Sequence, residues 1–154
     1  PSMEILLIVG SEMGNAEMVG DLVKDELESL GHTVEMITDG TLEELGLEDR
    51  STLLIVSSTT GLGDIPQNIE PIWEALNEER PDLSHLKYGL VGMGDRNYKD
   101  TFCGGPRKWD ALLSELGAAP AGEKLYLDAT DNPCPDEDAI AWLPSWLEAL
   151  SSST

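Results

Sequence analysis

Short runs of apolar residues alternate along this chain with segments in which apolar residues recur every three or four positions. Two of the runs, Glu4–Val9 and Leu53–Ser57, are apolar on both faces, as expected of strands in a parallel sheet that helices cover on both sides. The other predicted strands are Thr33–Thr38, Lys87–Met93 and Lys124–Asp128. This alternation predicts an α/β fold, a three-layer α/β/α sandwich whose five parallel strands are joined by right-handed crossovers.

Four helices are predicted from segments with apolar residues on one side. They cover residues 16–30, 69–76, 109–116 and 140–150. Gly31 and Gly117 follow the first and third helices, where glycine commonly ends a helix. Pro144 lies inside the last pattern, so we expect that helix either to kink or to start there. For a chain of this length the expected strand order is 2-1-3-4-5, which brings the carboxyl ends of the first, third and fourth strands together.

The length of 154 residues suits one domain with a continuous core, and we assign residues 3–150 to it. A hydrophobic content of 40% is sufficient for such a core. The net charge of −21 argues against nucleic acid and anionic membranes as partners and favours proteins with basic surfaces. The longest aliphatic run, Ile5–Val9, is too short to span a bilayer.

The chain ends and the cysteines suggest where the protein works. Residues 1–2 are expected to be vector-derived, with Met3 as the native start, and residues 151–154 are expected to form a frayed tail. We expect no secretory leader. Cys103 and Cys134 have neither metal-site nor redox-motif spacing, which indicates a reducing compartment. These features predict a cytoplasmic monomer without a metal site.

The loop after the first strand, Gly10–Glu17, has the composition of an anion-binding turn. Small and hydroxyl residues before a helix let several backbone N–H groups point at one anion. The loop lacks the lysine of a P-loop and the GxGxxG spacing of a dinucleotide site, so a single terminal phosphate fits better. For this loop taken alone, an ordinary serine N-cap is the alternative.

The loops after the third and fourth strands have a different chemistry. Ser57–Pro66 contains four consecutive hydroxyl residues and two glycines, which suit the polar edge of a flat ligand. Gly92–Cys103 contains Tyr98, whose ring can stack on a planar ligand. Taken alone, the loop Ser57–Pro66 is better explained as a glycine-rich turn. Taken alone, Tyr98 and Cys103 are better explained as residues that cover or fill the core. Together, at three adjacent strand ends, the loops predict a mononucleotide site with a stackable ring.

Three motifs carry a resemblance to a known family. They are SxxGNAE at Ser11–Glu17, SSTTGLGDIPQN at Ser57–Asn68 and GxGDRxYKDTFC at Gly92–Cys103. In this order and spacing they resemble the FMN-binding loops of short-chain flavodoxins, most of all the MioC-type subgroup. The resemblance covers almost the whole chain and implies a flavodoxin-like FMN-binding domain. The chain departs from the common pattern at Met13 and Thr60, where many members have a hydroxyl residue and a large aromatic residue.

The resemblance implies a set of FMN contacts. The phosphate would be held by Ser11, Glu12, Met13, Gly14, Asn15 and Ala16. The inner side of the isoalloxazine would be lined by Thr59, Thr60, Gly61 and Leu62, with Ser58 beside them. Its pyrimidine edge and outer face would be contacted by Gly94, Asp95, Asn97 and Tyr98, in a loop supported by Phe102 and Cys103.

The resemblance also implies an activity, that of a low-potential electron carrier between a reductase and acceptor enzymes rather than a turnover enzyme. In this family a backbone carbonyl turns to accept a proton from the flavin N5, and Gly61 stands at the matching position. Only glycine reaches that conformation without a steric cost of about 1–2 kcal/mol. Asp64, Glu70 and Asp100 are candidates for steering basic redox partners.

Other classes of function remain open from the sequence. An FMN-dependent quinone or azo reductase shares this architecture, but the short loops leave no obvious room for its nicotinamide site. A flavin-free binding module is the third class. A signalling module of the phospho-acceptor receiver type is disfavoured, because Gly10-Ser11 and Ser57-Ser58 stand where it requires acidic residues.

Overall fold

A parallel sheet forms the centre of the computed structural model, which describes residues 3–11, 15–58, 65–94, 104–128 and 135–152. Its strands are β1 (Glu4–Gly10), β2 (Thr33–Ile37), β3 (Thr52–Ser57), β4 (Lys87–Gly94), β5 (Ala119–Pro120) and β6 (Leu125–Asp128). They are ordered β2-β1-β3-β4-β5, and β6 also pairs with β4. All of these pairings are parallel. The predicted strand order is confirmed.

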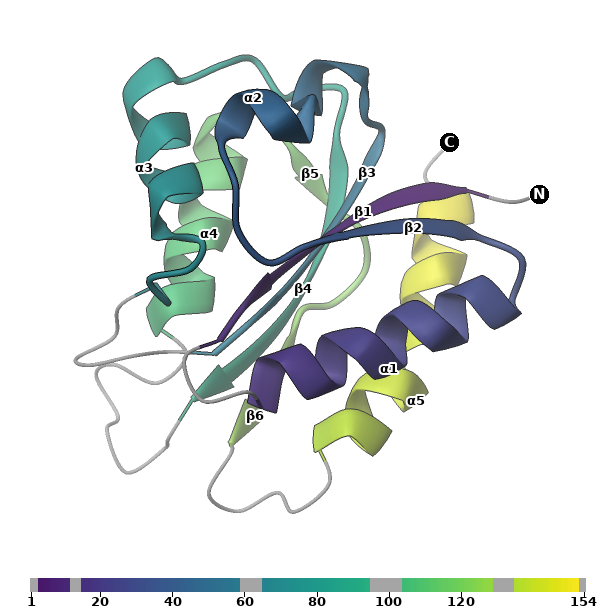
Figure 1. Ribbon diagram of the computed structural model, residues 1–154. Helices are drawn as coiled ribbons and strands as arrows, with labels where there is room; N and C mark the ends of the chain where they lie inside the picture. The colour runs from purple at the N-terminus through teal and green to yellow at the C-terminus, as the bar shows by residue number, and fades with distance from the viewer. Residues whose placement is uncertain (1–2, 12–14, 59–64, 95–103, 129–134, 153–154) are drawn as a thin grey trace.

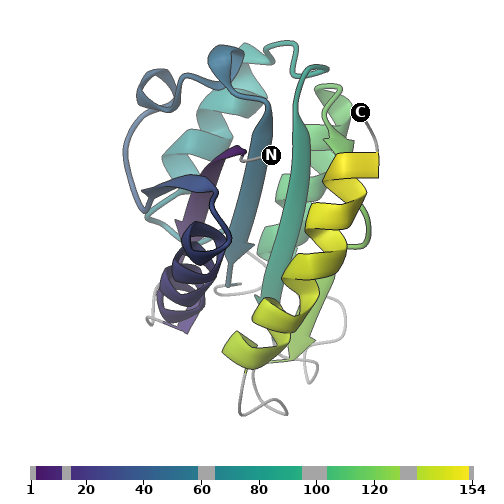
Figure 2. The same ribbon diagram turned by 90° about the vertical axis from the view of Figure 1, so that its right-hand side faces the viewer.

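Helices cover both faces of the sheet (Figures 1 and 2). They are α1 (Asn15–Ser29), α2 (Leu42–Leu45), α3 (Glu70–Glu79), α4 (Gly104–Glu115) and α5 (Pro135–Ser152), with one 3-10 turn, η1 (Leu47–Asp49). The side chains of α1 and α5 pack on one face, which we call the α1/α5 face. Those of α2, η1, α3 and α4 pack on the other, the α3/α4 face. This is the predicted three-layer sandwich.

Some details differ from the sequence prediction. The fifth position holds two short strands in tandem, since β5 pairs with residues 87–88 of β4 and β6 with residues 91–94. A start of the last helix at Pro144 is wrong, because α5 begins at Pro135 and continues through Pro144. α5 also includes two residues of the tail that was expected to be frayed. The short helix α2 and the turn η1 were not predicted, because segments of four and three residues are too short to show a repeat of apolar positions.

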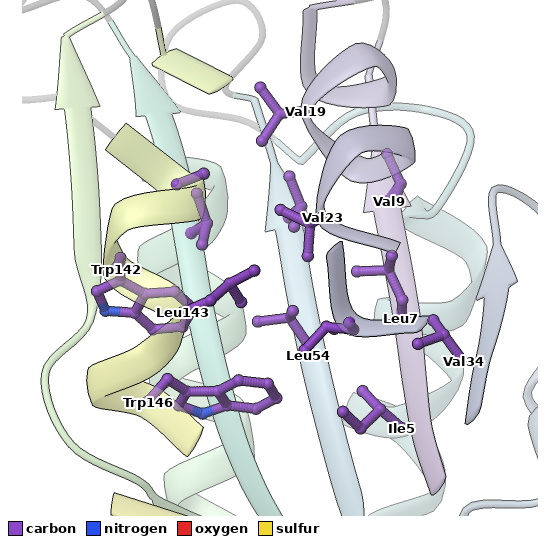
Figure 3. Close-up of a cluster of buried hydrophobic side chains, with 14 of the residues drawn as sticks. Ile5, Leu7, Val9, Val19, Val23, Val34, Leu54, Trp142, Leu143 and Trp146 are labelled. Atoms are coloured by element: carbon purple, nitrogen blue, oxygen red, sulfur yellow. The ribbon is translucent and has the colours of Figure 1, made fainter. Parts of the chain in front are cut away.

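The core has two halves, because successive residues of a strand point to opposite faces. Leu7 of β1 packs toward α1 and α5, whereas its neighbour Ile8 packs toward α3 and α4. Figure 3 shows the first half, where Val23 of α1 and Trp142 and Trp146 of α5 lie over the strands. Both faces are therefore closed by helices, and ligand access is left to the ends of the strands.

The predicted ends of two helices are confirmed. Gly31 follows α1 with φ 94°, and the N–H of His32 donates to the carbonyl of Leu27 at 3.1 Å. Gly117 follows α4 with φ 99°. Glycine is favoured there because a Cβ is strained at positive φ. Within the described ranges, no helix has both the length and the apolar character needed to cross a membrane.

Candidate functional site

Three strand ends meet at one edge of the sheet. Gly10 at the end of β1 is in register with Ser57 at the end of β3, and Ser57 is in register with Gly92 of β4. α1 begins at the same end of the molecule (Figure 1). The helix after β1, α1, packs on the α1/α5 face, whereas the helix after β3, α3, packs on the α3/α4 face. The two connections therefore leave the sheet on opposite sides, which opens a crevice between the ends of β1 and β3. Ligands of open parallel sheets bind in such a crevice, which makes this edge the candidate site.

Two glycines at this edge let α3 and α4 approach the strands closely. A Cβ on Gly10 would lie 2.8 Å from Cγ1 of Ile69, the residue before α3. A Cβ on Gly92 would lie 2.7 Å from Cβ and Cγ of Pro106 in the first turn of α4. The starts of both helices are therefore fixed against the strand ends.

Hydrogen bonds from the segment after β3 hold the end of β1. The N–H of Ser58 donates to the carbonyl of Gly10 at 2.9 Å, and the Ser58 hydroxyl donates to the same oxygen at 3.3 Å. The side-chain amide of Asn68 donates to the carbonyl of Val9 at 2.9 Å and accepts the N–H of Ser11 at 3.1 Å. The chain path from Val9 to Ser11 is set by these contacts.

Five of the predicted FMN contacts lie within the described residues: Ser11, Asn15, Ala16, Ser58 and Gly94. Ser11 and Ser58 directly follow the paired strands β1 and β3, Asn15 begins α1, and Gly94 ends β4. The side chain of Ala16 is fully buried in the core, which leaves its backbone as the part that can serve a ligand. The remaining predicted contacts lie outside the described residues: Glu12, Met13, Gly14, Thr59, Thr60, Gly61, Leu62, Asp95, Asn97, Tyr98, Phe102 and Cys103.

The described part of this edge fits a phosphorylated ligand. The first turn of a helix presents backbone N–H groups without an intrahelical acceptor and carries partial positive charge. α1 presents such a turn from Asn15 onward, a short distance along the chain from Ser11. The hydroxyls of Ser57 and Ser58, at the neighbouring strand end, donate to the carbonyls of Ser58 at 2.9 Å and Gly10 at 3.3 Å, so they hold the backbone there. The backbone N–H groups of the helix N-terminus suit a terminal phosphate such as that of FMN.

Acidic side chains dominate the surface of α1, the helix that begins at this edge. Its exposed carboxylates are those of Glu17, Asp21, Asp25 and Glu28. The lysine of this helix, Lys24, is paired with Glu28 at 3.0 Å. Of the three residues expected to steer partners, Glu70 is the first residue of α3, and the other two lie outside the described residues.

Asn68 is a residue of this edge that the sequence reasoning did not single out. Besides Val9 and Ser11, its side chain reaches the end of β2, where it donates to the carbonyl of Thr38 at 2.7 Å. The available signal was its position as the last residue of the motif Ser57–Asn68, just before a helix. Its partners are far away in sequence, so no local pattern reveals them.

Known proteins are similar to this chain in sequence and in fold. A family model described as flavodoxin matches residues 7–142. Protein MioC of Escherichia coli strain K12 is 42% identical over 147 residues, which cover 96% of this chain and 98% of MioC. Flavodoxin YqcA of Pectobacterium carotovorum is 36% identical over 149 residues, which cover 97% of this chain and 98% of YqcA. The structure of a point mutant of flavodoxin from Pseudomonas aeruginosa matches with a TM-score of 0.89 at 34% identity, over 97% of this chain and 99% of that one.

Proposed function

The chain belongs to the flavodoxin family, and from that premise we propose how its own residues hold the cofactor and select redox partners. As a flavodoxin it is an FMN-containing electron carrier that works between a reductase and acceptor proteins. Bound FMN supplies the redox chemistry, since its ring can accept and release one or two electrons. The polypeptide binds the phosphate, orients the ring and admits the partner.

We propose that residues 11–16 hold the phosphate. The observation that carries this proposal is the side-by-side register of Gly10, Ser57 and Gly92, with the first turn of α1 beginning at the same edge. The helix N-terminus favours a negatively charged group, and the backbone N–H groups of its first turn donate to it. Because the helix N-terminus and its backbone N–H groups already stabilise a negative charge, the proposed site does not need a lysine or arginine side chain for the phosphate.

The flavin ring is proposed to lie between residues 58–62 and residues 94–98, with Tyr98 stacked on its outer face. The support is that both segments are anchored at their ends. The first segment starts at Ser58, which donates hydrogen bonds to the carbonyl of Gly10 at the end of β1. The helices that follow the two segments begin in close contact with Gly10 of β1 and Gly92 of β4. A ring held between two anchored segments keeps a fixed orientation toward an incoming protein.

Binding of FMN compared with riboflavin tests the proposed phosphate site. Riboflavin has the same ring and lacks the phosphate, so the ratio of the two dissociation constants isolates the phosphate contacts. Hydrogen bonds to charged groups contribute about 1.5–3 kcal/mol each, so we expect apoprotein to prefer FMN by at least about tenfold. Equal affinity for the two flavins would contradict a phosphate site at residues 11–16.

We also propose that the protein is a carrier and not a turnover enzyme. The support is the similarity to a protein named flavodoxin along 97% of this chain, together with three loops that are assigned to FMN. The holoprotein alone should leave NADPH and NADH unconsumed in an absorbance assay at 340 nm, and added flavodoxin reductase should start the reaction. Steady consumption without a reductase would favour the quinone or azo reductase alternative.

The partners are proposed to be proteins with basic surfaces. The support is the net charge of −21 and the row of exposed carboxylates on α1, which begins at the site. Salt screens such attraction, so the rate of electron transfer from a reductase should fall steeply as ionic strength rises. A rate that stays constant from low to high salt would contradict electrostatic steering. The same charge opposes addition of negative charge to the bound cofactor and favours a low potential.

The remaining parts of the proposal concern the state of the protein. We propose that residues 3–150 act as one FMN-binding domain that works as a monomer in the cytoplasm. Repulsion between highly acidic copies of the chain supports the monomer, because like charges disfavour self-association. Sedimentation of the holoprotein at physiological salt should give the mass of one chain, and a dimer mass would contradict this part.

A further inference from the structure

The side chain of Asn68 joins three segments that are distant in sequence. It accepts the N–H of Ser11 at 3.1 Å, and it donates to the carbonyls of Val9 at 2.9 Å and Thr38 at 2.7 Å. Ser11 and Val9 bracket the end of β1, whereas Thr38 directly follows β2. A single carboxamide therefore fixes the exit of β1 relative to the exit of β2 and the start of α3.

This arrangement uses every kind of hydrogen-bonding group that an asparagine has. One oxygen acts as acceptor and one –NH2 group donates twice, which matches one backbone N–H and two carbonyls. An aspartate at position 68 would turn a negative oxygen toward two carbonyl oxygens. An aliphatic residue would form none of the three bonds. The position is therefore specific for an amide, although the residue does not stand among the predicted FMN contacts.

The bond to Ser11 also decides which donors remain for a phosphate. The N–H of Ser11 is engaged by Asn68, and the carbonyl before it, that of Gly10, is engaged by Ser58 at 2.9 Å. The backbone at the start of the proposed phosphate segment is thus held by residues of the segment after β3. Donors for the anion are left to positions further along the chain, toward the first turn of α1.

We propose that Asn68 is the positioning residue of the phosphate site, and that it makes the apoprotein selective for a phosphorylated flavin over an unphosphorylated one. The inference rests on the proposed function, in which residues 11–16 hold the phosphate. Asn68 acts through the backbone of Ser11, by fixing where the phosphate segment leaves the sheet before any flavin is bound. A site that is already in place binds more tightly, because binding does not have to order it.

The test compares flavin binding to apoprotein in two variants, Asn68→Ala and Asn68→Leu. Leucine keeps the branching of asparagine at Cγ but forms no hydrogen bonds, whereas alanine also removes the side chain beyond Cβ, so the pair separates loss of the hydrogen bonds from loss of packing. Each variant is titrated with FMN and with riboflavin by fluorescence quenching. We expect the affinity for FMN to fall by at least about tenfold, the equivalent of one lost hydrogen bond, and that for riboflavin to change by less than about twofold.

Asn77→Ala is the matched control. Asn77 lies near the end of α3, the helix that follows Asn68, and its exposed side chain accepts a hydrogen bond from Arg80 at 3.0 Å. This variant removes the same chemical group at a place far from the proposed phosphate segment. Its ratio of FMN to riboflavin affinity should equal that of the wild type.

A second measurement needs no flavin, and its first arm uses only the wild type. The Ser11 amide of wild-type apoprotein, followed by NMR hydrogen exchange, should be protected because Asn68 accepts its N–H. In the variants this amide should exchange faster, while amides in the middle of β1 keep their protection. A Ser11 amide that exchanges freely in the wild type would overturn the inference.

The outcomes separate this inference from the proposed function. If the wild type does not prefer FMN over riboflavin, the phosphate site itself is wrong. If the wild type prefers FMN and the two Asn68 variants keep that preference within about twofold, the phosphate site stands and the role of Asn68 is overturned. An equal loss of affinity for FMN and riboflavin would also overturn the proposed role of Asn68, because such a loss would show that Asn68 has only a general structural role.

Discussion

The two faces of the sheet are held together in different ways. On the α1/α5 face, Trp142 and Trp146 stack with ring centroids 5.6 Å apart. Gly89 of β4 lies beneath them, where a Cβ would be 2.6 Å from Cε2 of Trp146. On the α3/α4 face, apolar packing is joined by a partly buried polar link, in which the hydroxyl of Tyr88 donates to the carboxylate of Asp110 in α4. Apolar packing dominates the first face, where the indole N–H of Trp142 also donates to the carbonyl of Glu123 at 2.9 Å, whereas on the second face a side-chain hydrogen bond joins a helix directly to a strand.

The difference matters because the two faces position different parts of the proposed site. α1 follows the segment proposed for the phosphate, whereas α3 and α4 follow the segments proposed for the ring. α3 and α4 are also tied to each other, since the indole N–H of Trp73 donates to the carbonyl of Lys108 at 3.1 Å. The comparison teaches that α1 is placed mainly by apolar packing, while α3 and α4, which follow the segments proposed for the ring, are also linked to each other by a hydrogen bond.

Among changes that test this difference between the faces, replacement of the buried tryptophans should have the largest effect on the free energy of unfolding. Trp146→Ala should lower the free energy of unfolding by about 3–5 kcal/mol, because it removes a buried indole and leaves a cavity. Trp109→Ala is the matched change on the α3/α4 face. It should cost about 1 kcal/mol less, because among the described residues it breaks no stacked aromatic pair. Urea unfolding of the apoproteins measures both, and a larger loss for Trp109→Ala would contradict the difference between the faces.

Small-to-large changes at the glycine contacts come next. Gly92→Ala should destabilise the protein by about 2 kcal/mol, because its Cβ meets the rigid ring of Pro106. Since Pro106 lies in the first turn of α4, the visible spectrum of bound FMN should also shift. Gly20→Ala in α1 meets Val9 at 2.6 Å, but alanine regains up to about 1 kcal/mol of helix propensity. Gly20→Ala should therefore cost less, and a reversed order in urea unfolding would count against this account.

Tyr88→Phe removes the partly buried hydrogen bond to Asp110 and should cost about 1.5 kcal/mol at neutral pH. Burial, and then the hydrogen bond to Asp110, raise the pKa of Tyr88 well above its usual range. The link therefore contributes fully below the unfolded-state pKa of about 10, and the contribution is lost as pH rises beyond it, by up to about 1.4 kcal/mol per pH unit. The difference in stability between wild type and Tyr88→Phe should shrink above that pH. A difference that stays constant up to the alkaline limit of folding would refute the link.

The smallest effect is expected for Lys24→Ala on the outer surface of α1. Lys24 pairs with Glu28 at 3.0 Å, and both side chains are partly accessible to solvent. Exposed pairs of this spacing contribute about 0.3–0.5 kcal/mol, so urea unfolding should barely change. A loss above about 1 kcal/mol would show that charged contacts as well as shape hold the α1/α5 face.

Much of the fold followed from the sequence because buried strands and one-sided helices leave regular patterns. β5 left none, because two residues that include Pro120 make no apolar run. The beginning of α5 was missed because its first residues, after Pro135, are acidic and precede the apolar pattern. The three strand ends of the site could be predicted, since the order of a parallel sheet sets which ends are neighbours. Asn68 could not, because its function depends on backbone groups 30 to 59 residues away.

Titration of apoprotein with FMN tests the central claim most directly. We expect the bound flavin to lose its fluorescence at a stoichiometry of one FMN per chain, with a dissociation constant below about 1 μM, a free energy of about −8 kcal/mol or better. The complex should be yellow and should be reduced when a flavodoxin reductase and NADPH are added. A titration that shows no saturable binding of FMN would contradict the account.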